Sequence, residues 1–368
     1  MSKLKQFVKK YIPIYGIASI LLALVSLAFY LAMRSSSDFS ESIATGFSSY
    51  VRIVLSYSFG FLPFSFAELL LILSPLALTV VIILAVRAVK SSLASAVRLA
   101  LVILGTLLLF FSVYVFTLAP GYTRHTMASN MEIQAVNPTA EELYGTMKII
   151  ENEMEALLPE ITFGEDGSSV SPHTVAKLSE FICDGYEKVC TQYEGLGIIN
   201  FDQQAKPVLM SQGMTYLGIL GMYSYFTGES NVNIHHPDYS LPHCIAHEFA
   251  HSRGISRENE ANFIAFLVCI NSDDPYVKYS GYMNMYEYLA SALGKTDKEL
   301  LKQAYAEADS KIISEMAAYA DFYYANQIEL LNKISELVND NYLKSQGTEG
   351  VISYGLVVRL CVGYYKAQ

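Results

Sequence analysis

The sequence predicts a mainly helical protein in which three N-terminal membrane helices precede a soluble α+β domain with a small sheet. Hydrophobic residues make up 52 % of the 368 residues and charged residues only 16 %, whereas soluble domains carry about 25 % charged residues. The apolar excess lies almost wholly in the first 120 residues, and helical patterns dominate the remainder. We therefore expect a transmembrane region over residues 1–123 and a second domain over residues 124–368.

Three long apolar stretches make up the membrane region. They cover residues 11–33, 64–86 and 99–121 approximately. A helix needs about 20 apolar residues to cross ~30 Å of hydrocarbon, and these stretches reach that length. Three such runs in so short a segment would leave a soluble domain almost no polar surface. We therefore interpret them as membrane spans rather than buried core helices, with the lipid bilayer as a partner.

The positions of Lys and Arg set the expected orientation of the spans. Only Arg34 and Arg52 lie in the first loop, whereas seven basic residues lie before the first span or between the second and third: Lys3, Lys5, Lys9, Lys10, Arg87, Lys90 and Arg98. Loops rich in Lys and Arg stay in the cytoplasm. We expect a multi-pass protein of a bacterial-type plasma membrane with a cytoplasmic N-terminus. The domain after the third span is then extracytoplasmic.

This second domain is strongly acidic. From His125 to the C-terminus, 32 acidic residues stand against 15 basic ones. Nucleic-acid binding requires Lys and Arg to neutralise phosphates, so we expect no nucleic-acid partner. The five cysteines predict no disulfide framework. Cys183 and Cys190 lie about 10 Å apart if their segment is helical, too far to bridge, but a loop there would leave a disulfide open.

The second domain is expected to be mostly helical, with one β-rich segment. Thr139 and Glu142 form a capping-box pattern that opens a helix ending near residue 158. Residues 207–234 are dense in Tyr, Val, Ile and Thr, and predict two or three strands with a turn at 228–231. Other helices are expected near residues 171–194 (starting after Ser171 or Thr174), 241–252, 256–270, 281–293, 297–307 and 308–343, and from residue 351 to the end. We expect the last of these to pack on the domain, because it is short for a span and contains Arg359.

The most informative motif is HExxH, at His247-Glu248-Phe249-Ala250-His251. Two histidines four residues apart on a helix project from one face and can both bind one Zn²⁺. Glu248, one step round the helix, is then the candidate catalytic base for a water activated by the metal. The alternative is a pair of core histidines without a metal. The apolar residues at the other motif positions favour a buried helix whose histidines face a site.

A third metal ligand is expected just downstream. Gly254 ends the first helix, and a helix starting at Ser256 would direct a carboxylate back toward the histidines. Glu258 and Glu260 are the candidates, and only one can bind because two residues correspond to about 200° of rotation on a helix. Glu258 would lie in the first turn, where exposed amides stabilise a carboxylate without a metal. Glu260 would lie past that turn and would need a positive partner when buried.

The Asn-Glu-Ala run at 259–261 resembles the glutamate-bearing helix of the gluzincins, the thermolysin-like zinc peptidases. That resemblance assigns the third ligand to Glu260, with Glu258 as the alternative. His251-Ser252-Arg253-Gly254 also matches the start of the metzincin motif, but Arg257 occupies the position of the metzincin third histidine. The spacing to Glu260 is shorter than in thermolysin. With its three spans, the chain resembles an uncharacterised bacterial membrane-anchored family of unknown function with a gluzincin-like motif. The resemblance implies a zincin-like (gluzincin-type) metallopeptidase fold and a Zn²⁺ cofactor, but it brings no known substrate. From the zinc peptidase chemistry of HExxH we expect a peptide or protein substrate.

Three further features predict substrate contacts. The strand-like run at 221–233, with Asn231 and Asn233, could bind an extended peptide along its edge, or could be an ordinary packed strand. His243 lies one helical turn before His247 and is a candidate substrate contact. Tyr354 is a candidate hydrogen-bond donor to the oxyanion, although the chain holds 27 tyrosines.

Three functions remain open from the sequence. The first is a zinc metallopeptidase that hydrolyses extracytoplasmic peptides or proteins. The second is a metallopeptidase-like membrane sensor or signalling receptor, against which the sequence offers no cytoplasmic domain and no additional ligand-binding domain. The third is a non-catalytic structural zinc protein, against which Glu248 is retained.

Overall fold

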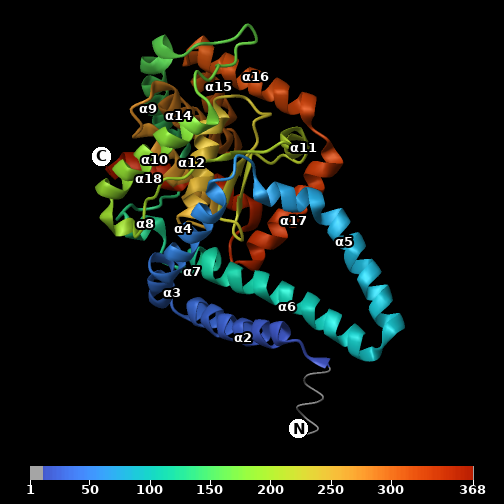
Figure 1. Ribbon diagram of the computed structural model, residues 1–368. Helices are drawn as coiled ribbons and strands as arrows, with labels where there is room; N and C mark the ends of the chain where they lie inside the picture. The colour runs from blue at the N-terminus through green and yellow to red at the C-terminus, as the bar shows by residue number, and fades with distance from the viewer. Residues whose placement is uncertain (1–10, 368) are drawn as a thin grey trace.

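The computed structural model describes residues 11–367, and it consists mainly of helices around one small sheet (Figure 1). Within this range three helices are long and apolar enough to cross a membrane: α2 (Ile14–Ser35), α5 (Phe66–Ser91) and α6 (Leu93–Thr117). Three membrane-compatible helices were predicted, and the structure confirms them with shifted bounds. The third begins at Leu93 rather than near residue 99. It ends at Thr117 because Pro120 lies in the first turn of a separate short helix, α7 (Ala119–Thr123).

The link between α5 and α6 is a single residue, Ser92, whose side chain caps the start of α6. Arg87 and Lys90 therefore lie inside α5 and Arg98 inside α6, so the prediction of a charged loop was wrong. All three still lie near the tip of this helical hairpin, which points away from the rest of the molecule (Figure 1). The basic residues predicted to precede the first span lie outside the described residues: Lys3, Lys5, Lys9 and Lys10.

The loop between the first and second spans is itself helical, which the sequence analysis missed. It forms α3 (Ser37–Thr45) and α4 (Phe47–Gly60). The α4 helix contacts α12 (Ser240–Ser252), the helix that carries HExxH. The predicted boundary at residue 123 therefore divides segments that pack against one another.

Most predicted helices of the second domain are present. The capping box of Thr139 and Glu142 opens α9, and Thr174 rather than Ser171 caps α10. The helix expected over 308–343 is two helices, separated by extended backbone at Gln327 and Ile328. The helical elements not yet named are α8 (Met127–Asn130), α9 (Ala140–Leu157), η1 (Leu158–Glu160), α10 (Val175–Gln192), η2 (Glu194–Leu196), α11 (Ser211–Tyr216), α13 (Glu258–Ile270), α14 (Pro275–Thr296), α15 (Lys298–Glu307), α16 (Ser310–Asn326), α17 (Glu329–Ser345), η3 (Gly350–Leu356) and α18 (Val357–Ala367).

The predicted β-rich segment forms a three-stranded sheet in the order β1-β3-β2. β1 (Lys206–Pro207) is parallel to β3 (Glu229–Val232), and β2 (Gly221–Ser224) is antiparallel to β3. The turn predicted at 228–231 was wrong because Glu229 already pairs with Ser224. The chain turns earlier, and Gly228 adopts the left-handed conformation (φ 70°) that glycine permits.

The core of the domain is built around α13. Eleven of its thirteen residues are buried, and it contacts α10, α12, α14 and α18. A helix buried on all sides carries apolar residues all round, as the run 263–269 does here. The C-terminal helix α18 packs on this core, as predicted. Cys183 and Cys190 both lie in α10 and are free, as their helical spacing requires.

Hydrogen bonds join the domain to the start of α5. The carboxylate of Glu229 accepts the first two backbone N–H groups of that helix, at 2.9 Å each. In return Glu68, inside α5, accepts the backbone N–H groups of Leu209 and Met210 at 3.0 and 2.7 Å. Free N–H groups at a helix start need acceptors, and here the sheet region supplies them. The domain is therefore held directly against the end of a membrane span.

A second connection joins the end of α6 to the end of α12. The buried guanidinium of Arg52 donates to the backbone carbonyls of Thr117 and Ser252, each at 3.1 Å, and to Ala44 at 3.0 Å. Ser256 donates to the carbonyl of Leu118 at 2.7 Å. The turn between α12 and α13 thus rests on the C-terminal end of α6.

Candidate metal centre

The two histidines of HExxH lie on one face of α12, as predicted. Their Nε2 atoms are 3.1 Å apart, and both side chains are almost buried. The helix ends as expected at Gly254, whose φ of 89° is left-handed. This reversal carries the chain directly into α13, which contacts α12 along its length.

The α13 helix brings Glu258, not Glu260, to the histidines. Oε2 of Glu258 lies 3.1 Å from Nε2 of His247 and 3.5 Å from Nε2 of His251. One potential ligand atom from each of these three residues lies within 4.8 Å of the others. Among the described residues this is the one group of at least three His, Cys, Asp or Glu side chains close enough to hold a metal ion.

The assignment of Glu260 is corrected by the position of the helix start. Ser256 does not cap α13, because its hydroxyl is bonded to Leu118; the helix begins at Glu258 itself. Glu260 consequently points away from the site. Its carboxylate accepts from Arg257 at 3.2 Å and from the backbone N–H of Met127 at 3.0 Å. The positive partner that its burial requires is therefore an arginine.

The Nδ1 atoms of both imidazoles, which face away from the site, lie within hydrogen-bonding distance of oxygen atoms. Nδ1 of His251 lies 2.7 Å from the carbonyl oxygen of Ile255, which can only accept, so this Nδ1 carries a proton. Nδ1 of His247 lies 2.7 Å from Oδ1 of Asn262, whose amide nitrogen donates to the Tyr288 hydroxyl at 3.0 Å. These contacts direct both Nε2 atoms inward. Metal-binding histidines in proteins commonly have such outer acceptors.

Burial and mutual charge shift the pKa values of this group. Burial alone would lower the pKa of His251, but the Glu258 carboxylate raises it to about 9. Burial alone would raise the pKa of Glu258, but the charges of His251 and His247 hold it well below its usual value. The raised pKa of His251 and the lowered pKa of Glu258 have the same cause: the buried Glu258 carboxylate is stabilised by a positive charge beside it.

The inward atoms of the group fit a cation. When both imidazoles are neutral, each Nε2 is an acceptor, and Glu258 adds a third acceptor about 3 Å away. Oε2 of Glu258 and Oε2 of Glu248 are buried and make no hydrogen bond with any described residue. Two nitrogens and one carboxylate oxygen form the donor set of many catalytic zinc sites. A Zn²⁺ ion would satisfy all three acceptors at once.

Glu248 lies beside this group, against strand β2. It is buried, and a Cβ at Gly221 would come within 2.5 Å of its Oε1 atom, so only glycine leaves room for this carboxylate. Burial raises the pKa of Glu248, while the two histidines oppose the shift. A carboxyl with a raised pKa close to a metal site is suited to exchanging a proton near neutral pH.

Of the predicted substrate contacts, Asn231 and Asn233 have hydrogen-bond partners within the domain, whereas Nε2 of His243 has none among the described residues. The side-chain amides of Asn231 and Asn233 donate to backbone carbonyls of Met222 and Ile219, at 3.0 Å each, so these contacts favour a structural role. His243 is buried one turn before His247, and its Nε2 has no hydrogen-bond partner among the described residues. Burial and then the neighbouring His247 lower the pKa of His243 to about 3, so it is neutral near pH 7.

Tyr354 lies in η3, close enough for the charges of Glu258 and Glu248 to add to burial in raising its pKa. Its hydroxyl accepts from Asn339 at 3.4 Å. The charge of Glu258 likewise adds to burial in raising the pKa values of Tyr122 and Tyr342, whose hydroxyls are 3.4 Å apart. The sequence analysis did not single out these two tyrosines, which come from segments far from HExxH along the chain. It also passed over Asn262, although this residue lies on the helix expected to supply the third ligand.

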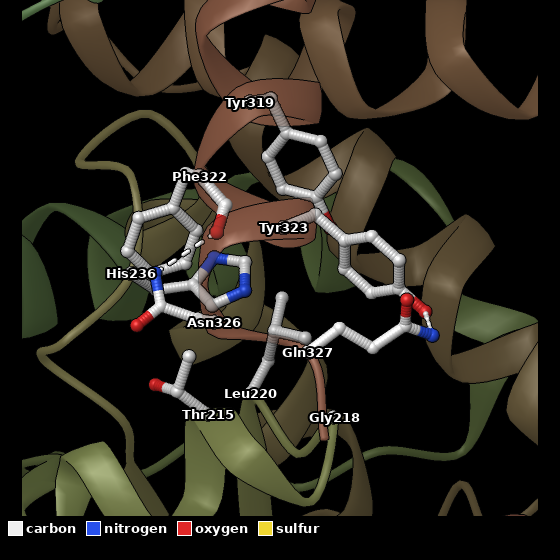
Figure 2. Close-up of a pocket in the computed structure, with 9 residues that line it drawn as sticks. All are labelled: Thr215, Gly218, Leu220, His236, Tyr319, Phe322, Tyr323, Asn326 and Gln327. Carbon is white, nitrogen blue, oxygen red and sulfur yellow. Dashed lines mark hydrogen bonds between the residues drawn. The ribbon is translucent and has the colours of Figure 1, made fainter. Parts of the chain in front are cut away.

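Figure 2 shows a separate cavity of about 60 Å³ on another part of the domain. Aromatic residues of α16 lie against His236 there, with ring centroids 5.5 Å away for Tyr319 and 5.2 Å for Phe322. Burial lowers the pKa of His236 to about 4, so its ring is neutral near pH 7. None of the three candidate ligands lines this cavity.

A family model described as a protein of unknown function (DUF3810) matches residues 44–362. The chain belongs to this family. The DUF3810 match begins at the end of α3 and runs into α18, so it joins the α5–α6 hairpin to the domain that carries HExxH. It confirms the expected membership of an uncharacterised family. No curated protein and no solved structure matches the chain.

Proposed function

We propose that this member of the DUF3810 family is a membrane-anchored zinc metallopeptidase that hydrolyses peptide bonds of extracytoplasmic peptides or proteins. One observation carries the proposal: two imidazole nitrogens and a carboxylate oxygen converge within 3.5 Å of one another. Oε2 of Glu248, which has no hydrogen-bond partner among the described residues, lies beside them. This combination is the donor set and the base that zinc hydrolases use.

The residues divide the chemistry between them. His247, His251 and Glu258 would hold Zn²⁺, which when bound supplies a Lewis acid that polarises a carbonyl and acidifies water. Glu248 would take a proton from the attacking water at its carboxylate and return it to the leaving amine. Tyr354 remains the candidate donor to the oxyanion, supported by its electrostatic closeness to Glu248.

The location of the site supports substrates near a membrane surface. The turn after His251 bonds to Leu118, directly after the third span, and Arg52 ties the end of α12 to the same place. We assign this side to the cell exterior, because Arg87, Lys90 and Arg98 lie at the opposite end of the α5–α6 hairpin. A reporter fused after Gly121 should accordingly be active only outside the cytoplasm.

Glu248→Gln tests the activity with the least structural change. The full chain in detergent or nanodiscs is loaded with zinc and assayed on a peptide library by mass spectrometry. Glu248→Gln should keep its zinc and lose hydrolysis by about 10²–10⁴-fold, because general-base catalysis is worth that much. Glu287→Gln is a matched control on α14 and should hydrolyse at the parent rate. Equal rates in Glu248→Gln and the parent would remove Glu248 from the mechanism.

A non-catalytic structural zinc site is the second candidate. The observation in its favour is burial: the three candidate ligand side chains are only 9–12 % exposed. Closed sites are typical of structural zinc, whereas catalytic sites keep a position open. Under this alternative, zinc would bind at one equivalent and stabilise the fold, and no peptide in the library would be cut by the parent.

A further inference from the structure

The α17 helix exposes several large apolar side chains. Its outer side carries Leu330, Ile334, Leu337 and Val338, which are 50–69 % exposed. Spacings of four, seven and eight residues place these four side chains on one face. We call them the α17 apolar stripe. A helix on the surface of a soluble domain normally turns such a face inward.

The side of α17 that faces the protein combines polar residues with the buried Leu343. Asn332 is buried, and Ser335 and Asn339 are half-buried. The amide of Asn339 reaches the Tyr354 hydroxyl near the candidate metal centre. The helix is therefore oriented by polar contacts on the inside, while its apolar stripe faces away from the protein. Water is an unfavourable surrounding for that stripe, at about 25 cal/mol per Å² of apolar surface.

The ends of α17 are held next to the spans. At its C-terminal end, Gln346 is hydrogen-bonded to Tyr114, in the last turn of α6. Near its N-terminal end, Oδ1 of Asn332 lies 3.4 Å from the position that a Cβ on Gly218 would occupy, so the two residues are neighbours. The short helix α11 connects that loop to Met210, which is bonded to Glu68 at the start of α5. Figure 1 shows α17 running from the side of α5 toward the side of α6. Both places lie where a span leaves the same membrane surface, so α17 lies along that surface.

We propose that α17 is an in-plane membrane-binding helix, with its apolar stripe in the lipid at the mouth of the α5–α6 hairpin. Amphipathic helices of this kind bury their apolar face ~5–10 Å into the headgroup boundary. The two lysines of α17, Lys333 and Lys344, pair with Glu329 and Asp340 on the same helix, so apolar burial rather than attraction to anionic lipid supplies the binding. Leu209, 86 % exposed beside the start of α5, extends the same surface.

Lipid fits this stripe better than a second protein does. A bilayer crossed by α5 and α6 would reach both ends of the helix, so a protein partner would have to displace lipid there. The hairpin between β2 and β3 touches the same region, with Phe226 5.4 Å from Phe110 of α6 by ring centroids. Aromatic residues at that depth are typical of the membrane interface.

The absence of tryptophan from the chain makes a direct test available. Single variants Leu337→Trp and Val338→Trp are reconstituted as full chains in vesicles of phosphatidylcholine with brominated acyl chains, which quench tryptophan on contact. Leu107→Trp, on the exposed face of α6, is the reference for full lipid contact. Lys302→Trp, on the exposed surface of α15, is the reference for water. All four positions are exposed, so folding should be retained, and circular dichroism checks it.

The expected result is quenching of both α17 probes to about half of that at Leu107→Trp, because an interfacial helix inserts only ~5–10 Å. Quenching no greater than at Lys302→Trp would overturn the proposal. A blue-shifted emission without quenching would overturn it as well, since it would mean that protein, such as a second copy of this chain, covers the stripe. These outcomes do not depend on zinc or on hydrolysis.

Discussion

Two buried polar clusters meet where α12 turns into α13, and they are built in opposite ways. In the first, the junction with the membrane helices, the guanidinium groups have acceptors. Arg52 donates to four backbone carbonyls, and Arg257 pairs with Glu260. In the second, the candidate metal centre, Glu258 and the inward nitrogens of His247 and His251 are acceptors whenever the imidazoles are neutral.

The contrast shows which partner the second cluster lacks. A buried charge or acceptor is tolerated when donors surround it and is costly when they do not. The junction supplies those donors from arginine side chains. The candidate metal centre has no arginine or lysine paired with its ligands among the described residues, and protonated imidazole is the one donor it can provide. A divalent cation would complete it in the way that arginine completes the junction.

The largest effect is expected from separating the two glutamates of α13. Glu258→Gln should weaken zinc binding by more than ~100-fold, since losing even an outer partner of a ligand costs 10–100-fold. Glu260→Gln should leave zinc affinity unchanged and lower the free energy of unfolding by about 1–3 kcal/mol, because Arg257 loses a charge-assisted hydrogen bond. Competition titration with a zinc indicator measures the first, and denaturant unfolding the second.

Thermal melts give the same comparison in stability. Zinc at about 1,000 times its dissociation constant should add about 4 kcal/mol to the parent, because it binds only the folded state. In Glu258→Gln and in the reference variant His251→Ala, a more than ~100-fold weaker site should reduce this gain to about 1.4 kcal/mol or less. If Glu260→Gln lost the gain while Glu258→Gln kept it, the ligand would be Glu260, as the gluzincin resemblance implies.

The sequence predicted one half of the candidate site and misplaced the other. HExxH is local: its helix, its end at Gly254 and the common face of its histidines all follow from residues within one element. The third ligand depended on where α13 begins. Ser256 looks like a cap, but its hydroxyl is bonded to Leu118, 138 residues earlier. No local pattern reveals such a contact, and shifting the helix start changes which glutamate faces the histidines.

The fold divides in the same way. Span lengths and the capping box of Thr139 are properties of continuous segments, and both were predicted. The helices α3 and α4 were missed because their place is set by distant partners. Arg52 of α4, for example, donates hydrogen bonds to Thr117 of α6 and Ser252 of α12. The break before α17 has no Gly or Pro to signal it, since Gln327 and Ile328 occupy it.

A further carboxyl, that of the half-buried Glu287, extends the comparison with a smaller effect. Burial raises the pKa of Glu287 to about 7, and the hydrogen bond from Tyr239, at 2.5 Å, only partly opposes it. Because the folded pKa exceeds the ordinary value of 4.5, the folded state retains a proton that the unfolded state loses. Stability from this group is complete below pH 4.5 and is lost as the pH rises to about 7.

Glu287→Gln should therefore flatten the pH dependence of unfolding between pH 5 and 7.5, by up to about 3 kcal/mol relative to the parent, since one pKa unit is worth ~1.4 kcal/mol. Denaturant midpoints at the two pH values measure it. If the free energy of unfolding changed with pH equally in the parent and in Glu287→Gln, Glu287 would have an ordinary pKa. Burying a carboxylate without a nearby cation would then cost little at this position.

The smallest effect concerns how the two histidines are held. His251 is fixed by the backbone carbonyl of Ile255, which no substitution removes, whereas His247 depends on the side chain of Asn262. Asn262→Ala should free the His247 ring and weaken zinc binding by about 10–100-fold, the usual cost of losing an outer partner. Asn262→Asp keeps an oxygen acceptor at the same place and should retain most of the affinity. Zinc titration of the two variants distinguishes them. Equal zinc affinities for Asn262→Ala and the parent would show that the position of His247 on α12 is enough to orient its ring. The hydrogen bond from Nδ1 to Asn262 would then not contribute to zinc binding.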